Sequence, residues 1–220
     1  MVSESSQQFV LIPVDSVTLE GGLDLPKETK AVVVFAHGSG SSRHSPRNKF
    51  VAQVLREAEI GTLLFDLLTK EEDEVHGARF DIDLLTLRLK AVTFWLKAQP
   101  HMRELNIGYF GASTGAAAAL RAAADLGTVI GAIVSRGGRP DLAEKSLEKV
   151  QSPTLLIVGG FDDVVIHINQ QAYRKIKTEK ELTIIPAATH LFEEPGALEE
   201  VARLATEWFK KHLLAKHAEG

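Results

Sequence analysis

The chain has 220 residues, no cysteine and a formal net charge of −4, with 45% hydrophobic and 25% charged residues. Its length suits one α/β domain over residues 1–220 better than two small domains. The negative charge argues against nucleic acid or an anionic membrane as the main partner, and the lack of cysteine excludes disulfides, thiolate metal ligands and a cysteine nucleophile.

Strand-like apolar segments alternate with helical patterns along the chain. The expected strands are residues 9–13, 17–21, 31–36, 61–65, 106–110, 129–134, 153–158 and 182–185, the first two as a hairpin. Apolar residues recur at helical spacing in residues 50–58, 82–96 and 198–213, and residues 116–124 form a run of helix formers. Because strands and helices alternate, the sequence predicts βαβ units, a mostly parallel sheet and right-handed crossovers.

The run Gly-Ala-Ser-Thr-Gly at residues 111–115 stands between an expected strand and the helix former at 116–124. Strand, G-x-S-x-G and helix together form the context of a nucleophile elbow. In such a turn the serine adopts a strained, positive φ, and the glycines leave room for neighbouring backbone. The helix start directs free N–H groups and a positive dipole end at developing negative charge. This context favours Ser113 as a nucleophile over a structural turn serine.

Further polar residues follow the carboxyl ends of other expected strands, where ligands bind in an open α/β sheet. They include the loop at residues 37–40, Asp162 and His190. Ser113, Asp162 and His190 stand in the chain order of nucleophile, acid and histidine in α/β hydrolases. The histidine would accept the proton of the serine, and the carboxylate would fix the tautomer of the histidine.

The acid and the histidine each have an alternative role. Asp162 is favoured over Asp163 because it follows the Gly-Gly-Phe turn closely enough to point back at the end of the sheet. Asp163 is expected to cap a helix that begins near Val165. His190 could instead be a capping or surface residue, but it alone among the histidines lies between the last expected strand and the last helix.

Attack by the serine would leave an oxyanion, which needs hydrogen-bond donors already aimed at it. The N–H of Thr114 supplies one donor by its position after Ser113. A backbone N–H of the loop at residues 37–40 supplies the other, and we expect it to be that of Ser39. His37 is expected to support this loop rather than to act as the base.

Four motifs together resemble the dienelactone hydrolase-like branch of the α/β-hydrolase superfamily over nearly the whole chain. They are A-H-G-S-G at 36–40, G-Y-F-G-A-S-T-G at 108–115, G-G-F-D at 159–162 and A-T-H-L-F at 188–192. The resemblance implies an α/β-hydrolase fold with an eight-stranded sheet, catalysis without metal or cofactor, and activity on esters or lactones. Dienelactone hydrolases proper carry a cysteine nucleophile, so Ser113 shifts the expectation towards general carboxylesters.

The expected site is open. Only residues 135–140 separate a strand from the next helical pattern, which leaves no room for a cap domain. An uncapped site should favour small, soluble acyl groups over long lipid chains. Two loops, at residues 41–48 and 69–80, are expected to shape it.

Arginines gather on the rim of the expected site, and the resembled family holds a substrate carboxylate with arginines. The rim arginines are Arg43, Arg47, Arg79, Arg136 and Arg139. Arg136 is the best single candidate for binding substrate because it directly follows an expected strand. The alternative is that these arginines lie on the surface or pair with the acidic residues at 71–74.

The sequence thus predicts a serine hydrolase that cleaves small carboxylic esters or lactones through an acyl-enzyme. A metal hydrolase is disfavoured because no H-x-H or H-E-x-x-H spacing occurs. A non-catalytic binding protein with the same fold and an engineered hydrolase scaffold remain alternatives. The polar residues 1–6 do not fit a secretory signal, so a cytoplasmic location is the default expectation, and the oligomeric state stays open.

Overall fold

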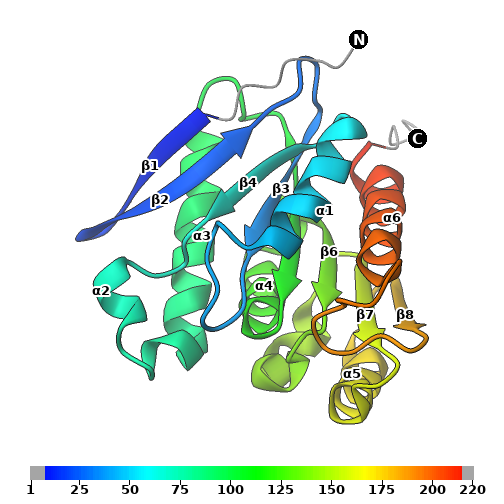
Figure 1. Ribbon diagram of the computed structural model, residues 1–220. Helices are drawn as coiled ribbons and strands as arrows, with labels where there is room; N and C mark the ends of the chain where they lie inside the picture. Colours follow the sequence, from blue (N-terminus) through cyan, green and yellow to red (C-terminus); the bar gives the residue numbers. More distant parts are fainter. Residues whose placement is uncertain (1–7, 215–220) are drawn as a thin grey trace.

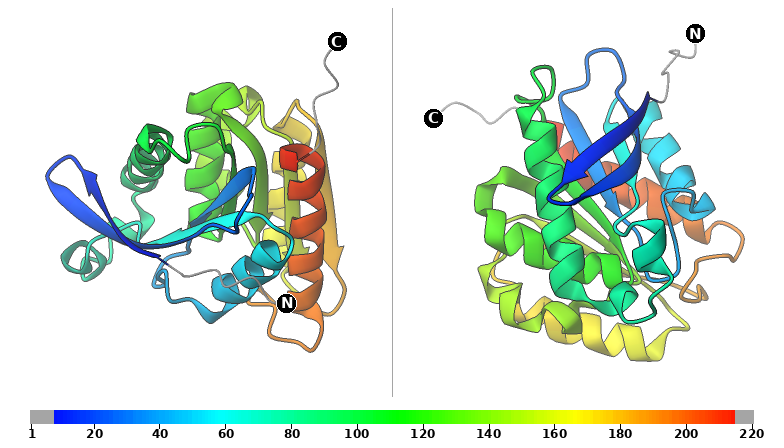
Figure 2. Two further views of the ribbon diagram at one scale, coloured as in Figure 1. Left: turned by 90° about the horizontal axis from the view of Figure 1, so that it is seen from above. Right: turned by 90° about the vertical axis from the view of Figure 1, so that its left-hand side faces the viewer.

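The structure, a computed structural model, describes residues 8–214 as one sheet between two layers of helices (Figures 1 and 2). The strands are β1 (Gln8–Val14), β2 (Val17–Asp24), β3 (Ala31–Ala36), β4 (Gly61–Phe65), β5 (Asn106–Ala112), β6 (Ile130–Arg136), β7 (Thr154–Gly159) and β8 (Lys180–Ile185). Their order in the sheet is β1-β2-β4-β3-β5-β6-β7-β8. The strands from β3 to β8 run parallel, and β2 is antiparallel to both of its neighbours. The predicted, mostly parallel eight-stranded sheet is confirmed.

All eight expected strands are present, but β5 and β6 reach two residues further than expected at their carboxyl ends. They do so because Gly111 and Ala112 pair in parallel register with Ser135 and Arg136. As a consequence, Ser113 follows its strand directly, and Arg136 ends the neighbouring strand at the same edge of the sheet.

Helices cover both faces of the sheet. The α-helices are α1 (Pro46–Glu57), α2 (Lys70–Asp73), α3 (Ile82–Ala98), α4 (Thr114–Leu126), α5 (Asp163–Lys175) and α6 (Ala197–Phe209). The 3-10 helices are η1 (Ala78–Phe80), η2 (Gly127–Val129) and η3 (Pro140–Lys149), and a π-helical turn, η4 (Lys210–Leu214), follows α6. Helices α3, α4 and α5 pack with η3 on one face, whereas α1 and α6 pack together on the other (Figure 2).

Two apolar clusters, one on each face, form the core. Along β3, Val32 and Val34 belong to the cluster beneath α3 and α4, while Val33 and Phe35 belong to the cluster beneath α1 and α6. Because side chains alternate across a strand, a strand buried on both faces must be apolar throughout. The same reason makes the central strands easy to find in the sequence.

The loops expected at residues 41–48 and 69–80 are partly helical. Helix α1 already begins at Pro46, where the Ser45 side chain accepts the N–H of Asn48. Residues 69–80 contain α2 and η1, and Thr69 and Glu72 form a reciprocal capping box at the start of α2. The T-x-x-E spacing carried this signal in the sequence, so the expectation of a plain loop was wrong.

The carboxyl edge of the sheet is open. Only residues 137–139 separate β6 from η3, and within residues 8–214 no separate cap domain covers the edge. This agrees with the predicted absence of a cap. No helix in the described part of the chain combines the length and apolar character needed to cross a membrane.

Candidate active site

Ser113 occupies a sharp turn between β5 and α4. Its backbone has a φ of 51° and a ψ of −119°, a conformation that costs a non-glycine residue about 1–3 kcal/mol unless its surroundings enforce it. The end of β6 and the β6–η3 loop supply that enforcement: the Ser113 N–H donates to the Arg136 carbonyl at 3.2 Å, and the Arg139 N–H donates to the Ser113 carbonyl at 3.1 Å. The predicted positive φ is therefore present.

The glycines on either side of Ser113 are required by close backbone contacts. A Cβ on Gly115 would lie 2.1 Å from the carbonyl oxygen of Ala36, and one on Gly111 would lie 2.5 Å from the Cα of Ala116. Both distances are impossible without moving α4 away from the sheet. The G-x-S-x-G spacing thus lets α4 begin directly against β3 and β5.

Asp162 and His190 contact each other at the same edge of the sheet, after the ends of β7 and β8. His190 Nδ1 lies 2.6 Å from Asp162 Oδ2, and backbone bonds bring the two segments together. The Gly160 N–H donates to the Ile185 carbonyl, and the Phe161 N–H donates to the Ala188 carbonyl. The β7–α5 turn is therefore bonded to the segment that leads to His190. The carboxylate is more buried than the imidazole, whose side chain is 38% exposed.

Asp163 has a different role from the one expected. Helix α5 begins at Asp163 itself, and Asp162 occupies the N-cap position without a side-chain capping bond. The prediction that Asp163 caps a helix starting near Val165 was wrong. The Asp162 carboxylate is bonded to His190 instead of to the helix. Asp163 lies within the first turn of α5.

The β6–η3 loop contacts both Ser113 and His190. Gly137 has a φ of 52°, and a Cβ there would lie 3.4 Å from His190 Nδ1. The Gly137 N–H is fixed by the carbonyl of Ile157 at 2.8 Å. No hydrogen bond joins Ser113 Oγ to His190 within residues 8–214; such bonds often tighten only when substrate is bound. The sequence analysis did not predict that Gly137 lies against His190. The Gly-Gly pair after the expected strand indicated a tight turn there.

The β3–α1 loop runs beside Ser113 on its other side. His37 Nε2 accepts the N–H of Leu67 at 3.0 Å, which leaves the proton on Nδ1, 3.0 Å from the Gly38 carbonyl. Burial lowers the pKa of His37 and so favours this neutral form. A Cβ on Gly38 would lie 3.1 Å from Ser113 Cβ. His37 supports the loop, as expected.

The Ser39 N–H is already bonded. It donates to the side-chain Oγ1 of Thr114 at 2.9 Å, whereas the sequence led us to expect it to point freely at an oxyanion. Thr114 is the first residue of α4, so its own N–H has no acceptor within the helix. The prediction considered only backbone groups and missed the hydrogen bond to the threonine side chain.

Arg136 differs from the other rim arginines. Arg43, Arg47, Arg79 and Arg139 each pair with a carboxylate. Arg136 is only 8% exposed, and its Nε and Nη1 have no hydrogen-bond partner in the part of the chain that the structure describes. Its guanidinium lies 5.9 Å from the centre of the Phe192 ring. Burial, together with nearby Arg47, lowers the pKa of Arg136 to about 10, so it stays cationic at neutral pH.

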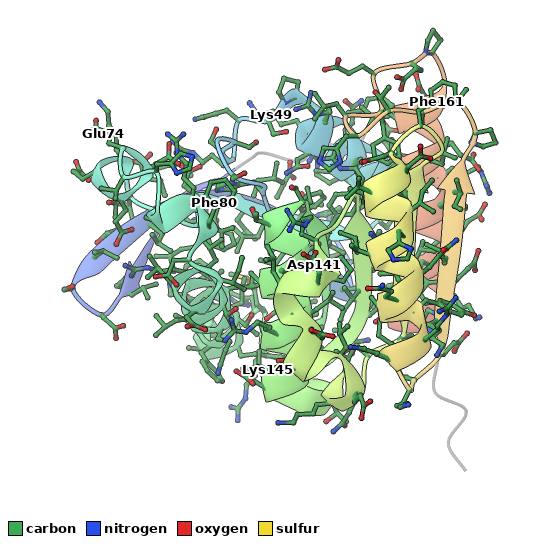
Figure 3. All side chains as sticks on the ribbon, turned by 90° about the horizontal axis from the view of Figure 1, so that it is seen from below. Lys49, Glu74, Phe80, Asp141, Lys145 and Phe161 are labelled. Atoms are coloured by element: carbon green, nitrogen blue, oxygen red, sulfur yellow. The ribbon has the colours of Figure 1, made fainter. Side chains whose placement is uncertain are left out.

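Exposed apolar residues stand next to Asp162 and His190 in the chain. Phe161 is 69% exposed and Val164 is 74% exposed, and Leu191 is also exposed. Figure 3 views the molecule from this edge and labels Phe161 at the turn before α5. A cavity of about 740 Å³ lies between His37, Asp66 and Thr69, and neither Ser113 nor the Asp162–His190 pair lines it.

Comparison with known proteins identifies the family. The model of the Dienelactone hydrolase family matches residues 45–213. The crystal structure of a dienelactone hydrolase from Anabaena variabilis is 53% identical, covers 96% of this chain and 99% of that one, and superposes with a TM-score of 0.94. Est1E from Butyrivibrio proteoclasticus covers 96% of this chain and all of its own, with a TM-score of 0.82 and 18% identity, and thus shares the fold.

Two curated relatives are much longer. Proteins from two strains of Mycobacterium tuberculosis, both named as phosphoribosyl transferases, are 58% identical over 197 residues. The match covers 90% of this chain and 44% of theirs, so the chain spans less than half the length of these relatives. Together with the α/β-hydrolase sheet, the family match shows that this chain belongs to the dienelactone hydrolase family.

Proposed function

We propose that this protein is a serine hydrolase that cleaves small carboxylic esters or lactones through an acyl-enzyme. Ser113 is the nucleophile, His190 the base and Asp162 the acid of this proposal. The observation that carries it is the 2.6 Å contact between His190 Nδ1 and Asp162 Oδ2. This pair lies against the same β6–η3 loop that holds Ser113 at its positive φ.

In the proposed reaction, Ser113 Oγ attacks the ester carbonyl while His190 Nε2 accepts the hydroxyl proton. Asp162 keeps the other proton on Nδ1 and stabilises the imidazolium. The tetrahedral oxyanion is held by the N–H of Thr114 together with the segment at Ser39. His190 then protonates the departing alkoxide, and water enters to release the acid by the same steps in reverse.

The surroundings of the site favour small substrates with an apolar part and an acidic part. Phe161, Val164 and Leu191, which neighbour Asp162 or His190 in the chain, offer exposed apolar surface. We propose Arg136 as the group that binds a substrate carboxylate, because its guanidinium has unused donors in the described structure. A charged hydrogen bond of this kind contributes about 1.5–3 kcal/mol.

Two other functions are less well supported. A non-catalytic binding protein would not need a serine held at a strained, positive φ, since that conformation costs stability. The name phosphoribosyl transferase belongs to proteins of which this chain matches 44%, whereas residues 45–213 of this chain match the model of the dienelactone hydrolase family.

Labelling with a fluorophosphonate probe, followed by peptide mapping, tests the proposal. We expect the probe on Ser113 in the wild-type protein and no labelling in Ser113→Ala, because only an activated serine reacts with this electrophile. A folded wild-type protein that remains unlabelled would instead favour the binding-protein function.

A further inference from the structure

The hydroxyl of Thr114 joins the two segments that flank Ser113. Its Oγ1 accepts the N–H of Ser39 at 2.9 Å, across 75 positions of the chain. Ser39 follows Gly38, where a Cβ would lie 3.8 Å from Ser113 Oγ. Thr114 itself is the residue after Ser113. The hydroxyl therefore lies between two backbone segments that both border the nucleophile.

This hydroxyl has an unused donor. Thr114 is 2% exposed, and within residues 8–214 its Oγ1 takes part in one hydrogen bond, as an acceptor. A hydroxyl carries one donor and two acceptor sites, so accepting the Ser39 N–H leaves the hydroxyl proton of Thr114 free to be donated. Within residues 8–214 no acceptor takes this proton, and it is available to a group of the substrate.

We propose that the Thr114 hydroxyl is a catalytic donor to the oxyanion, with the Ser39 N–H acting through it. The inference rests on the proposed attack of Ser113 on an ester carbonyl. Ser39 N–H donates to Thr114 Oγ1, and Thr114 O–H donates to the developing negative oxygen. The proton stays on Thr114 throughout, so no bond is made or broken at this residue.

The arrangement predicts an effect on the transition state rather than on substrate binding. A hydroxyl that accepts a hydrogen bond is a stronger donor, since linked hydrogen bonds polarise one another. The oxyanion carries more charge than the ground-state carbonyl, so the bond strengthens as the reaction proceeds. Loss of one donor of this kind lowers kcat about 10²–10³-fold.

Thr114→Val and Thr114→Ser form the matched test. Valine keeps the shape and the backbone N–H but removes the hydroxyl, whereas serine keeps the hydroxyl. With p-nitrophenyl acetate, we expect valine to lower kcat about 10²–10³-fold with little change in KM, and serine to restore most of the loss. Affinity for a trifluoromethyl ketone, which adds to the serine as a tetrahedral anion, should fall with kcat in the valine variant, while affinity for the product acetate should not.

The opposite result is equally informative. In Thr114→Val the Ser39 N–H loses its acceptor and becomes free. If that N–H were the direct donor, kcat would stay at the wild-type level or rise, and the inference would be wrong. Thr114→Ala provides the same comparison if valine destabilises the turn, with thermal unfolding measured for each variant.

Failure of the proposed function gives a different result. In that case the wild-type protein neither hydrolyses the ester nor reacts with the fluorophosphonate probe. If the wild type is labelled at Ser113 but Thr114→Val retains full kcat, only the role of the Thr114 hydroxyl is refuted.

Discussion

The turn at Ser113 and the guanidinium of Arg136 are neighbours at one edge of the sheet, yet they are built differently. Ser113 is held by main-chain hydrogen bonds on both its N–H and its carbonyl, and by glycines that admit no side chain. Arg136 is buried with Nε and Nη1 unpartnered in the described residues. The first region is preorganised by backbone, which suits bond making; the second has unused donors, which suits binding an anion.

The largest expected effect is on kcat, when the side chain of Ser113 or its base is removed. Ser113→Ala should lower kcat for short p-nitrophenyl esters roughly 10⁴–10⁶-fold, because the nucleophile and its base act as a unit. His190→Ala should cause a comparable loss. Circular dichroism should show an unchanged fold in both variants. Wild-type rates in purified Ser113→Ala would place the nucleophile elsewhere.

The two adjacent carboxylates give the next comparison. Asp162→Asn should lower kcat about 10⁴-fold, because the amide no longer holds the catalytic tautomer of His190. Asp163→Asn, a matched change one residue away in the first turn of α5, should cost little activity. Steady-state kinetics of both variants decide the assignment, and a reversed order would move the acid to Asp163.

A smaller effect is expected at Arg136. Arg136→Gln should lower kcat/KM for p-nitrophenyl hemisuccinate, which carries a carboxylate, roughly ten- to a hundred-fold. The rate with neutral p-nitrophenyl butyrate should hardly change. Arg139→Gln serves as the control, because the Arg139 side chain pairs with Asp141. Equal losses on both esters, with lower thermal stability, would mean that Arg136 only supports its own loop.

The smallest expected effect concerns pH and the loop carried by His37. Burial lowers the pKa of folded His37 below its unfolded value of about 6.5, so the neutral form stabilises the fold. That contribution is complete above the unfolded pKa and is lost as pH falls through the folded pKa. Thermal unfolding between pH 8 and 5 should therefore show a steeper acid loss in the wild type than in His37→Asn. If the unfolding temperatures of the two proteins fell in parallel with pH, His37 would not contribute to the loss of stability in acid.

The sequence predicted the features that backbone geometry dictates. The central strands were clear because a strand buried on both faces is apolar at every position. The Ser113 turn was clear because the close approach of α4 to β3 requires glycine at fixed positions. Asp162 and His190 were found from their places after β7 and β8, and the structure brings these two side chains into contact.

The features that depend on side-chain packing were not predictable in the same way. The hydrogen bond from the Ser39 N–H to Thr114 Oγ1 joins residues far apart in the chain, and no local sequence pattern indicates it. Likewise, the sequence places five arginines on the rim of the site, and only the folded chain shows that four of them pair with carboxylates while Arg136 pairs with none among residues 8–214.

The central claim, an acyl-enzyme on Ser113, is tested most directly by trapping that intermediate. The wild-type protein is mixed with p-nitrophenyl acetate, quenched with acid during turnover and digested, and the acetylated peptide is mapped by mass spectrometry. The account predicts acetyl on Ser113 in the wild type and none on that peptide in His190→Ala. Rapid hydrolysis with no acetyl on Ser113, or with acetyl on another residue, would contradict it.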